Sequence, residues 1–193
     1  MLTPSIAGSY TAAVSELRTS PHVEVLTGSG AEGEPACVLV DAAEFIARPQ
    51  LREEVFGPLT MVVSCADEGD LLAVADRLDG QLTSTVHAGA SDRQLAEALL
   101  DVLAAHAGRL IWNGFPTGVA VSPAMQHGGP YPASTDPRTT SVGTAAIDRF
   151  LRPVAYQEVP DALLPPELQD ANPLGIVRQV GDVLTDAAVE RPS

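Results

Sequence analysis

The stretch LTMVVSCADEGDLLAVADRLDGQLTSTVHAGASDRQLAEALLDVLAAHAGRLIWN, from Leu59 to Asn113, decides the fold because its hydrophobic pattern alternates between strand and helix. Three apolar segments have strand length, and two segments between them carry apolar residues at helical spacing. The strands are expected at 59–64, 82–87 and 110–112, and the helices at 71–78 and 95–103. Strand, helix, strand, helix, strand with short links is typical of right-handed crossovers. The sequence therefore predicts an α/β fold, a three-layer αβα arrangement with a mostly parallel sheet.

Helix boundary signals accompany this pattern. Asp67, with Asp70 three residues later, has the spacing of an N-cap and a capping box before the first helix. Ser91 and Gln94 form an S-x-x-Q capping box before the second helix. Gly108 follows the second helix, where a left-handed C-terminal cap is favoured.

The flanking segments extend this organisation in both directions. A helix is expected at 6–17, strands at 23–26 and 36–40, a link at 29–35, a short helix at 144–151 and a late strand at 153–157. The stretch 114–141 is rich in Gly, Pro, Ser and Thr and is too long for a plain connector, which usually marks a functional loop. We expect one incomplete catalytic domain over residues 1–157 and an irregular C-terminal extension over 158–193.

Composition excludes several classes of protein. The formal net charge is -14, and the 11 basic residues are all arginines that form no basic run, so we expect neither a nucleic-acid nor an anionic-membrane surface. No segment approaches the roughly 20 apolar residues of a membrane span, and the N-terminus lacks the order of a signal peptide. A cytoplasmic location is therefore expected. Cys37 and Cys65 lie in or beside apolar runs without a neighbouring base, as small buried hydrophobes do.

Two apparent motifs carry little weight. Gly28, Gly30 and Gly33 spell the G-x-G-x-x-G of a dinucleotide-binding turn, but a strand-like segment follows where that motif requires a helix. A surface turn is therefore expected. The four histidines show no metal-ligand spacing, and no metal site is predicted. His127 alone lies inside the long loop, where an imidazole could face a ligand or be an ordinary, partly exposed side chain.

Leu51 to Pro58, with the sequence LREEVFGP, combines an acidic pair, an aromatic residue and a Gly-Pro turn. A carboxylate can accept hydrogen bonds from both hydroxyls of a ribose, and an aromatic ring offers a flat face to a heteroaromatic ring. The pattern thus fits a clasp for a nucleotide cofactor. It also fits the end of a short helix, and the spacing alone leaves both interpretations open.

Several longer motifs, in this order, resemble the C-terminal part of the aldehyde dehydrogenase superfamily. They include EEVFGP at 53–58, GRLIWN at 108–113, NGFPTGV at 113–119, HGGPYP at 127–132 and RTTSVGTAAI at 138–147. The continuations FLRPV, DALLPP and DANPLGI are similar to the branch that oxidises α-ketoglutaric semialdehyde (2,5-dioxovalerate) and fatty aldehydes. The resemblance implies that the chain is part of an NAD(P)-dependent enzyme that oxidises an aldehyde to a carboxylic acid.

The resemblance also implies roles for four residues. Glu54 would bind the hydroxyls of the nicotinamide ribose, and Phe56 would lie against the nicotinamide ring of NADP or NAD. Phe115 would form an apolar wall of the aldehyde tunnel, with His127 at a position where many relatives carry Phe. That substitution suggests a more polar tunnel end.

The family's nucleophilic Cys, its Glu base, its oxyanion-hole Asn and its cofactor domain lie upstream of the segment that this chain resembles. Cys37 and Cys65 do not match the nucleophile, so no catalytic residue is predicted here, and the isolated chain is expected to be inactive. Met1 corresponds to an internal position, as in a truncated gene, a split gene or a mis-assigned start. The predicted partners are the aldehyde and the missing N-terminal half or a homologous subunit, with a homo-oligomer in the full-length context. The alternative is a non-catalytic partner or relic that keeps only packing and oligomer contacts.

Overall fold

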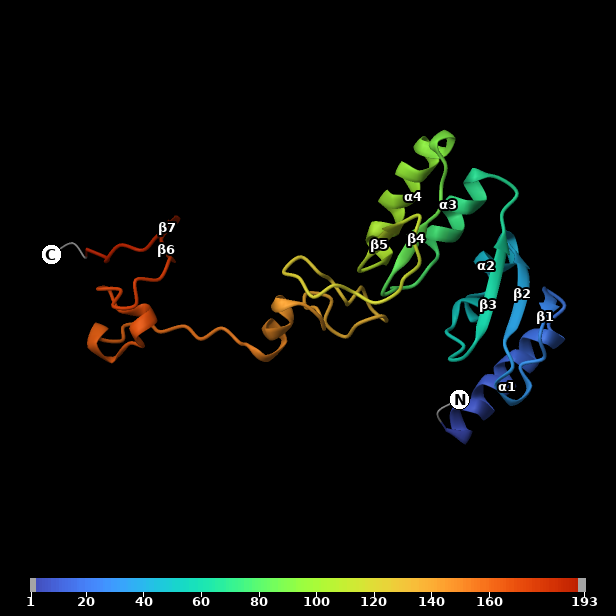
Figure 1. The fold of residues 1–193 in the computed structure, drawn as a ribbon, viewed down its shortest axis with the longest axis horizontal. Helices are drawn as coiled ribbons and strands as arrows, with labels where there is room; N and C mark the ends of the chain where they lie inside the picture. Colours follow the sequence, from blue (N-terminus) through green and yellow to red (C-terminus); the bar gives the residue numbers. More distant parts are fainter. Residues whose placement is uncertain (1–2, 191–193) are drawn as a thin grey trace. The chain divides into compact units, whose positions relative to one another are not determined.

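The computed structural model describes residues 3–190 and divides them into two compact units (Figure 1). The first unit ends at Arg149 and the second begins at Phe150. Met1 lies outside the described residues. The predicted domain boundary at residue 157 stays a prediction, since compactness alone does not define a domain.

The first sheet contains β1 (Val23–Thr27), β2 (Ala36–Asp41) and β3 (Leu59–Ser64), in that order. β1 runs antiparallel to β2, while β2 and β3 run parallel over a six-pair register. The link between β1 and β2 contains a 3-10 turn, η1 (Ala31–Gly33), and its glycines at 28, 30 and 33 have positive φ angles. This turn joins two antiparallel strands and opens no helix, so it is not a dinucleotide-binding turn.

The second sheet pairs β4 (Ser84–Val86) with β5 (Leu110–Trp112) in parallel. The α/β class is confirmed, and the parallel strand pairs are distributed over two sheets, because β3 and β4 belong to different sheets. The crossover rule fixes the handedness of a connection between parallel strands. It does not fix which strands are neighbours, since consecutive strands are neighbours in only roughly two-thirds of cases. The pattern of a single chain therefore could not reveal the break.

Helices cover one face of the first sheet. α1 (Pro4–Thr19), α2 (Ala42–Ala47) and α3 (Glu68–Asp76) contribute the buried or half-buried residues Tyr10, Phe45 and Val74 to clusters that include β2 and β3. The opposite face of β3 is exposed at Thr60 and Val62. The second helix layer of a three-layer arrangement is thus not built over this strand by the residues that the structure describes.

The second sheet packs against α3 and α4 (Arg93–His106) around a core of Ala75, Val86, Ala96 and Leu103. The amphipathic spacing of both helices places these apolar residues on the face turned to the sheet. The bounds of all the strands and helices predicted between Leu59 and Asn113 agree with the structure to within a few residues.

The predicted caps are confirmed for α3 and wrong for α4. The Asp67 carboxylate accepts a hydrogen bond from the Asp70 N–H at 2.9 Å. Before α4, a 3-10 turn, η3 (Ala90–Asp92), takes the place of the Ser91 cap. There the Asp92 carboxylate accepts from the Gly89 N–H at 2.8 Å and the Ser91 hydroxyl at 2.9 Å, and these two bonds lower the pKa of Asp92. An acid directly after Ser91 engages the hydroxyl that would otherwise cap the helix.

The end of α4 also differs from the prediction. Ala107 is its C-cap in an extended conformation, and Gly108 does not adopt a positive φ angle. After the long loop, the expected helix at 144–151 is a 3-10 helix, η4 (Thr144–Phe150), and the expected strand at 153–157 is irregular. Residues 153–157 lie in the second unit, and within the part of the chain that the structure describes they pair with no strand.

The second unit is built from turns around one buried polar residue. It contains η5 (Asp161–Leu163), η6 (Pro166–Leu168), and the antiparallel pair β6 (Arg178–Val180) and β7 (Val183–Thr185). The Asn172 side chain is buried, donates to the Ile176 and Asp186 carbonyls, and accepts from the Ile176 N–H. Several large apolar side chains of this unit are exposed, so hydrogen bonds rather than an apolar core organise it.

Between residues 3 and 190, no helix has both the length and the apolar character needed to cross a bilayer.

Asn113 fastens the ends of β4 and β5. Its φ angle is 47°, its side chain donates to the Ala88 carbonyl at 3.0 Å, and its side-chain oxygen accepts from the Ala88 N–H at 2.8 Å. Asn113→Ala removes both hydrogen bonds. It leaves in the left-handed region an alanine whose side chain forms no hydrogen bond to offset the backbone strain. We expect a loss of about 1–3 kcal/mol in the free energy of unfolding.

Urea unfolding followed by circular dichroism measures this loss. Asn113→Gly is the matched control, since it loses the bonds but tolerates the backbone angle, and it should be less destabilised than Asn113→Ala. Equal stability of wild type and Asn113→Ala would contradict this role.

Candidate functional site

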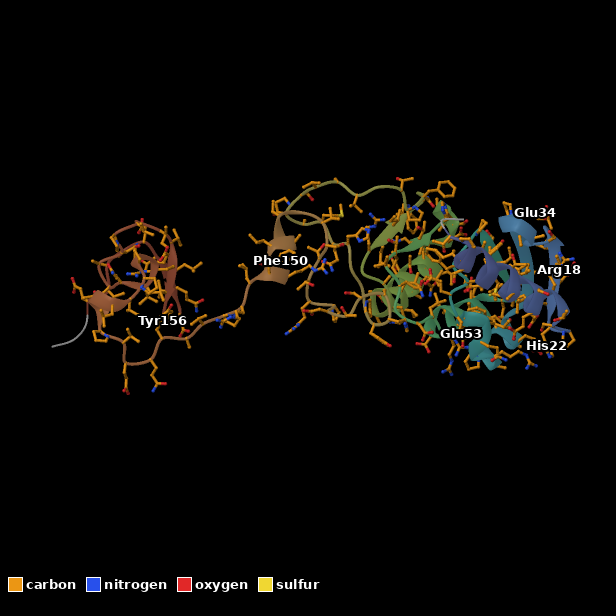
Figure 2. The ribbon with its side chains drawn as sticks, turned by 90° about the horizontal axis from the view of Figure 1, so that it is seen from below. Arg18, His22, Glu34, Glu53, Phe150 and Tyr156 are labelled. Carbon is orange, nitrogen blue, oxygen red and sulfur yellow. The ribbon has the colours of Figure 1, made fainter. Side chains whose placement is uncertain are left out.

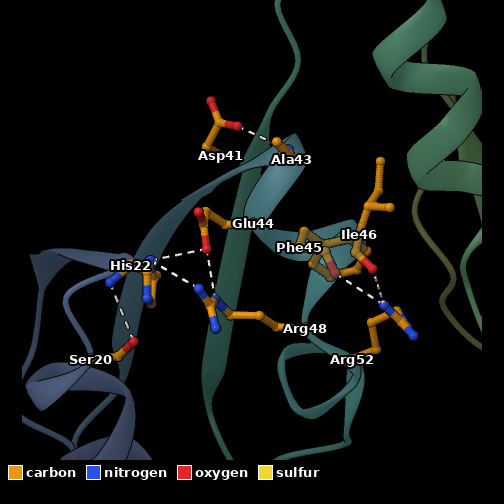
Figure 3. Close-up of polar contacts among 9 residues, drawn as sticks. All are labelled: Ser20, His22, Asp41, Ala43, Glu44, Phe45, Ile46, Arg48 and Arg52. Atoms are coloured by element: carbon orange, nitrogen blue, oxygen red, sulfur yellow. Dashed lines mark hydrogen bonds and ion pairs between the residues drawn. The ribbon is translucent and has the colours of Figure 1, made fainter.

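The acidic segment at 53–58 begins where a short helical stretch ends. η2 (Pro49–Arg52) follows α2, and Glu53 is its C-cap in an extended conformation. The Arg52 guanidinium donates to the carbonyls of Phe45 and Ile46 at 3.0 and 3.1 Å, which ties η2 back to α2 (Figure 3). Leu51 is buried in the cluster of Val40 and Phe45. The start of the acidic segment is therefore held by packing and by a charged hydrogen-bond donor.

The end of the segment is held by β2 and α1. Val55 packs against the cluster of Tyr10, Val14 and Ala36. The Pro58 carbonyl accepts from the Ala36 N–H at 3.0 Å and lies 3.2 Å from the Tyr10 hydroxyl, which also donates to the Glu34 carbonyl at 2.8 Å. Burial raises the pKa of Tyr10, so the hydroxyl stays protonated and can donate.

Glu53 and Glu54 project from this anchored segment at the junction of three cavities. The first, here called the central cavity, has a volume of about 470 Å³ and lies between β3 and the start of β4. A cavity of about 250 Å³ beside α1 and a groove of about 800 Å³ bordered by Pro132 and Ala133 also include both glutamates. Figure 2 shows Glu53 on the same side of the ribbon as His22, which lines the smaller cavity. Both carboxylates are exposed and can reach a ligand.

Phe56 lies two residues further on and is 63% exposed. It is absent from the lining of the three cavities, although it shares the anchored segment with Glu54. The exposed ring offers a flat apolar face, and the exposed carboxylate of Glu54 offers a hydrogen-bond acceptor. Glu54 and Phe56 thus share one short segment that is anchored at both ends, but they line no common cavity.

Phe115 and His127 lie in the long loop and are not brought together. Phe115 is 79% exposed, and its ring centroid is 5.6 Å from that of His87 at an interplanar angle of 52°. His127 is half-buried, its backbone N–H donates to the Thr140 hydroxyl at 2.8 Å, and its ring Nδ1 is 3.1 Å from the Ser141 hydroxyl. A side chain that is fixed on the loop in this way has a defined direction.

The cavity next to His127 adjoins the groove next to Glu54. The His127 cavity has a volume of about 400 Å³ and shares Leu82, Pro132 and Ala133 with that groove. The two predicted ligand-facing residues therefore line neighbouring concavities with one common wall. Phe115 lines neither of them.

Close backbone contacts position the His127 segment. A Cβ atom added to Gly108 would lie 2.0 Å from the Gly128 carbonyl oxygen, and one added to Gly129 would lie 2.4 Å from the Gln81 carbonyl oxygen. Glycine is required at both positions because the two backbone segments approach more closely than any side chain permits. Gly108, predicted as a helix cap, instead allows the loop backbone at Gly128 to lie directly against it.

A half-exposed ionic cluster lies at the edge of the smaller cavity. Glu44 Oε2 is 2.6 Å from Arg48 Nε and 2.9 Å from His22 Nδ1, so it joins α2 to the start of β1 (Figure 3). Partly solvated ion pairs contribute little net stability, typically about 0–1 kcal/mol. The cluster shapes this edge more than it stabilises the fold.

Neither cysteine has the environment of an activated nucleophile. Burial and the nearby carboxylates of Asp70, Asp41 and Asp67 raise the pKa of the Cys65 thiol, which reduces its thiolate fraction. Cys37 is a free, half-buried thiol on β2. Across residues 3–190 no three or more of His, Cys, Asp and Glu are grouped so as to hold a metal ion.

Sequence reasoning assigned no role to three residues that build this site. Glu53 lines the same three cavities as Glu54, while Tyr10 and Arg52 hold the two ends of the segment. The four-residue spacing of Tyr10 and Val14 on α1 was an available signal for a buried tyrosine. No sequence signal linked that tyrosine to Pro58.

No protein family model matches the sequence. The chain is 47% identical over 184 residues to α-ketoglutaric semialdehyde dehydrogenase 2 of Azospirillum brasilense, a match that covers 92% of this chain and 35% of that protein. It is 56% identical over 137 residues to α-ketoglutaric semialdehyde dehydrogenase of Acinetobacter baylyi, with 71% and 26% coverage. The chain thus spans about a third of the length of these curated relatives or less.

Several solved structures share the fold of this chain. The Δ-pyrroline-5-carboxylate dehydrogenase from Mycobacterium tuberculosis bound with NAD is 26% identical with a TM-score of 0.54, covering 70% of this chain and 25% of that one. Another structure of that dehydrogenase has 22% identity and a TM-score of 0.62, covering 85% and 32%. Aldehyde dehydrogenase 21 from Physcomitrella patens, in complex with succinate, is 23% identical with a TM-score of 0.53, covering 67% and 25%.

Replacing Tyr10 with Phe tests how the acidic segment is anchored. The change leaves the Glu34 and Pro58 carbonyls without the hydroxyl donor. We expect a loss of about 1–2 kcal/mol in the free energy of unfolding by urea titration. Tyr131→Phe is the matched control, since Tyr131 is 79% exposed, and it should leave stability unchanged. A Tyr10→Phe protein as stable as its control would rule out the anchor.

Gly108→Ala tests the close backbone contact between Gly108 and the His127 segment. The added Cβ forces apart two backbones, so we expect about 1–3 kcal/mol of destabilisation, or roughly 2–12 °C in Tm. Differential scanning calorimetry measures the shift. Gly118→Ala, a loop glycine with open space around its Cβ position, is the control and should change Tm little. An unchanged Tm for Gly108→Ala would refute the close approach.

Proposed function

Because this chain belongs to the aldehyde dehydrogenase superfamily, we propose that it forms part of an NAD(P)-dependent enzyme that oxidises an aldehyde to a carboxylic acid. The proposed aldehyde is α-ketoglutaric semialdehyde, since two relatives that are 47% and 56% identical carry that name. The chain spans only a fraction of those relatives, so the proposed enzyme needs a further segment.

The observation that carries the proposal is the placement of Glu54. Its carboxylate is exposed at the junction of three cavities, on a segment fixed by Leu51, Val55 and Pro58. A carboxylate can accept both hydroxyls of a ribose, and charged acceptors make the stronger hydrogen bonds. The residues present therefore fit a ribose diol of NAD or NADP, with Glu54 as its acceptor. The choice between NAD and NADP is left open.

Phe56 complements this acceptor. Its exposed ring lies two residues from Glu54 and offers a face against which a planar nicotinamide can rest. When bound, the cofactor supplies the acceptor for the hydride that leaves the aldehyde carbon. Glu54 and Phe56 hold and orient the cofactor, which limits its motion and favours a reactive geometry.

The long loop is the proposed substrate side. His127 lines a cavity that shares a wall with the groove at Glu54, and its Nδ1 lies beside the Ser141 hydroxyl. An imidazole there can hydrogen-bond to a polar aldehyde such as one that ends in a carboxylate. Phe115, on an exposed part of the same loop, is proposed as an apolar wall of the tunnel.

The nucleophile is proposed to come from outside this chain. The Cys65 thiol has a raised pKa, and the segment around Cys37 is a β-strand of the core sheet. The isolated chain should therefore bind no aldehyde covalently and turn none over. The predicted cytoplasmic location and homo-oligomeric state are further parts of this proposal.

A chimera tests the function directly. The chain is fused to the segment of the A. brasilense relative that precedes the match, and reduction of NAD and NADP is followed spectrophotometrically with α-ketoglutaric semialdehyde. We expect turnover by the chimera and none by the chain alone. A folded chimera without turnover would favour a non-catalytic partner or relic, and turnover by the chain alone would contradict the need for an external nucleophile.

Glu54→Gln in the active chimera tests the cofactor contact. The change keeps the size of the side chain but removes its charge, so we expect the KM for the cofactor to rise on the order of 10-fold, the equivalent of about 1.4 kcal/mol. Glu53→Gln is the matched control, because Glu53 lines the same cavities and the substitution removes the same charge. Equal effects of the two substitutions would reduce the role of Glu54 to general electrostatics.

A further inference from the structure

The His127 cavity has a lining unlike that of the three cavities at Glu54. Each of those three is lined by three acidic residues, whereas the lining of the His127 cavity includes none. It is lined instead by Arg149, the imidazole and five hydroxyl-bearing residues, at positions 134, 135, 139, 140 and 141. In a chain with a formal net charge of -14, a concave surface of this kind attracts an anion rather than a cation.

Hydrogen bonds between two limbs of the long loop fix the wall of this cavity. The His127 carbonyl accepts from the Ser141 N–H at 3.0 Å and from the Ser141 hydroxyl at 2.8 Å. The Gln126 side chain donates to the Thr139 carbonyl at 3.1 Å, next to the bond between the His127 N–H and Thr140. Because the wall is already ordered, a ligand that binds there loses little free energy in ordering it.

The bonds already formed show which polar groups remain for a ligand. The hydroxyls at positions 134, 139, 140 and 141 each donate to a backbone carbonyl. Within residues 3–190, the Thr135 hydroxyl and the Arg149 guanidinium form no hydrogen bond or ion pair. Arg149 lies on η4 and is exposed, so its side chain can turn to a ligand without disturbing a core.

Asp136 carries the negative charge that Arg149 senses, but another arginine already binds it. Arg138 Nε donates to one carboxylate oxygen of Asp136 at 3.0 Å, and its Nη2 donates to the other at 3.3 Å. These bonds, with a smaller contribution from the charge of Arg149, lower the pKa of Asp136. Since Asp136 has its own guanidinium partner, the donors of Arg149 stay available for an anion in the cavity.

We propose that the His127 cavity is a carboxylate-binding site, which holds the carboxylate end of the aldehyde substrate. The Arg149 guanidinium binds the two carboxylate oxygens, and the Thr135 hydroxyl supplies a further donor. The aldehyde end then points to the groove at Glu54, with which the cavity shares a wall. Arg149 is thus a specificity-determining residue. The identity of the ligand rests on the proposed function, whereas the carboxylate site rests on the cavity and its charge.

The size of the cavity and the shape of its charged group favour this class of ligand. A volume of about 400 Å³ lies in the range of small-molecule sites, roughly 300–1,000 Å³. One planar guanidinium matches the two oxygens of one carboxylate, and α-ketoglutaric semialdehyde carries one carboxylate. A free organic acid has the same chemistry, so the experiments below separate an acid from the substrate.

The first test measures binding to the chain itself. The probe is glutarate, an unreactive dicarboxylate with the carbon length of α-ketoglutaric semialdehyde, and NMR follows the isotope-labelled chain. We expect saturable shifts of the Thr135 and Ser141 amide signals, and none with the uncharged diol of the same length. Arg149→Gln should weaken binding at least 10-fold. Arg93→Gln, which removes the same charge from an ion pair with Glu97 outside the cavity, should bind like wild type.

The second test asks whether the ligand is the substrate. In the active chimera, kcat/KM is measured for α-ketoglutaric semialdehyde and for pentanal, an aldehyde of the same length without a carboxylate. We expect Arg149→Gln to lower the ratio of the two kcat/KM values at least 10-fold. Arg149→Lys, which keeps the charge but loses the planar fork, should lower the ratio less. Arg93→Gln should leave the ratio unchanged.

The two tests overturn the proposal in different ways. Absence of saturable glutarate binding, or equal binding by wild type and Arg149→Gln, would overturn the carboxylate site. Binding that depends on Arg149, with an unchanged kcat/KM ratio in the chimera, would assign the site to a free acid and overturn its role for the substrate. A chimera without turnover would count against the proposed function, while glutarate binding that depends on Arg149 would still support the carboxylate site.

Discussion

The six-pair parallel ladder between β2 and β3 is the interaction on which the rest of the structure depends. Val38 and Val40 of β2 are fully buried beneath α1 and α2, so the ladder is fixed on one face by apolar packing. Because Ala36 also bonds the Pro58 carbonyl, the same ladder fixes the end of the acidic segment. The position of Glu54 thus follows from strand register rather than from the conformation of a free loop.

The elements between Leu59 and Asn113 were predictable from sequence, because each buries one face and so shows a clear period. Their pairing was not, since periodicity reports which residues face a core and carries no information about which strand lies alongside. The α4 cap failed because Asp92 competes locally for the Ser91 hydroxyl. The expected strand at 153–157 failed because a strand needs a partner, and within the described residues this segment has none.

The candidate site divides in the same way. The resemblance singled out Glu54 and His127, and the structure places them in neighbouring cavities with a common wall. The supporting residues could not be found from sequence, because Tyr10 reaches Pro58 across 48 positions and Gly108 matters only through its contact with Gly128. Long-range contacts of this kind leave no local pattern.

Two features of the chain converge on one place. The carboxylate proposed to hold the cofactor stands at the mouth of the cavity whose walls are unpaired strand edges.

The central claim is that Glu54 binds the hydroxyls of the nicotinamide ribose, and a comparison of cofactor analogues measures this most directly. Binding of the cofactor and of an analogue that lacks one nicotinamide-ribose hydroxyl is measured by calorimetry on the chimera and on its Glu54→Ala variant. The account predicts that the chimera binds the analogue on the order of 10-fold more weakly than the cofactor, while the variant does not distinguish the two. An equal loss of affinity for the analogue in both proteins would contradict it.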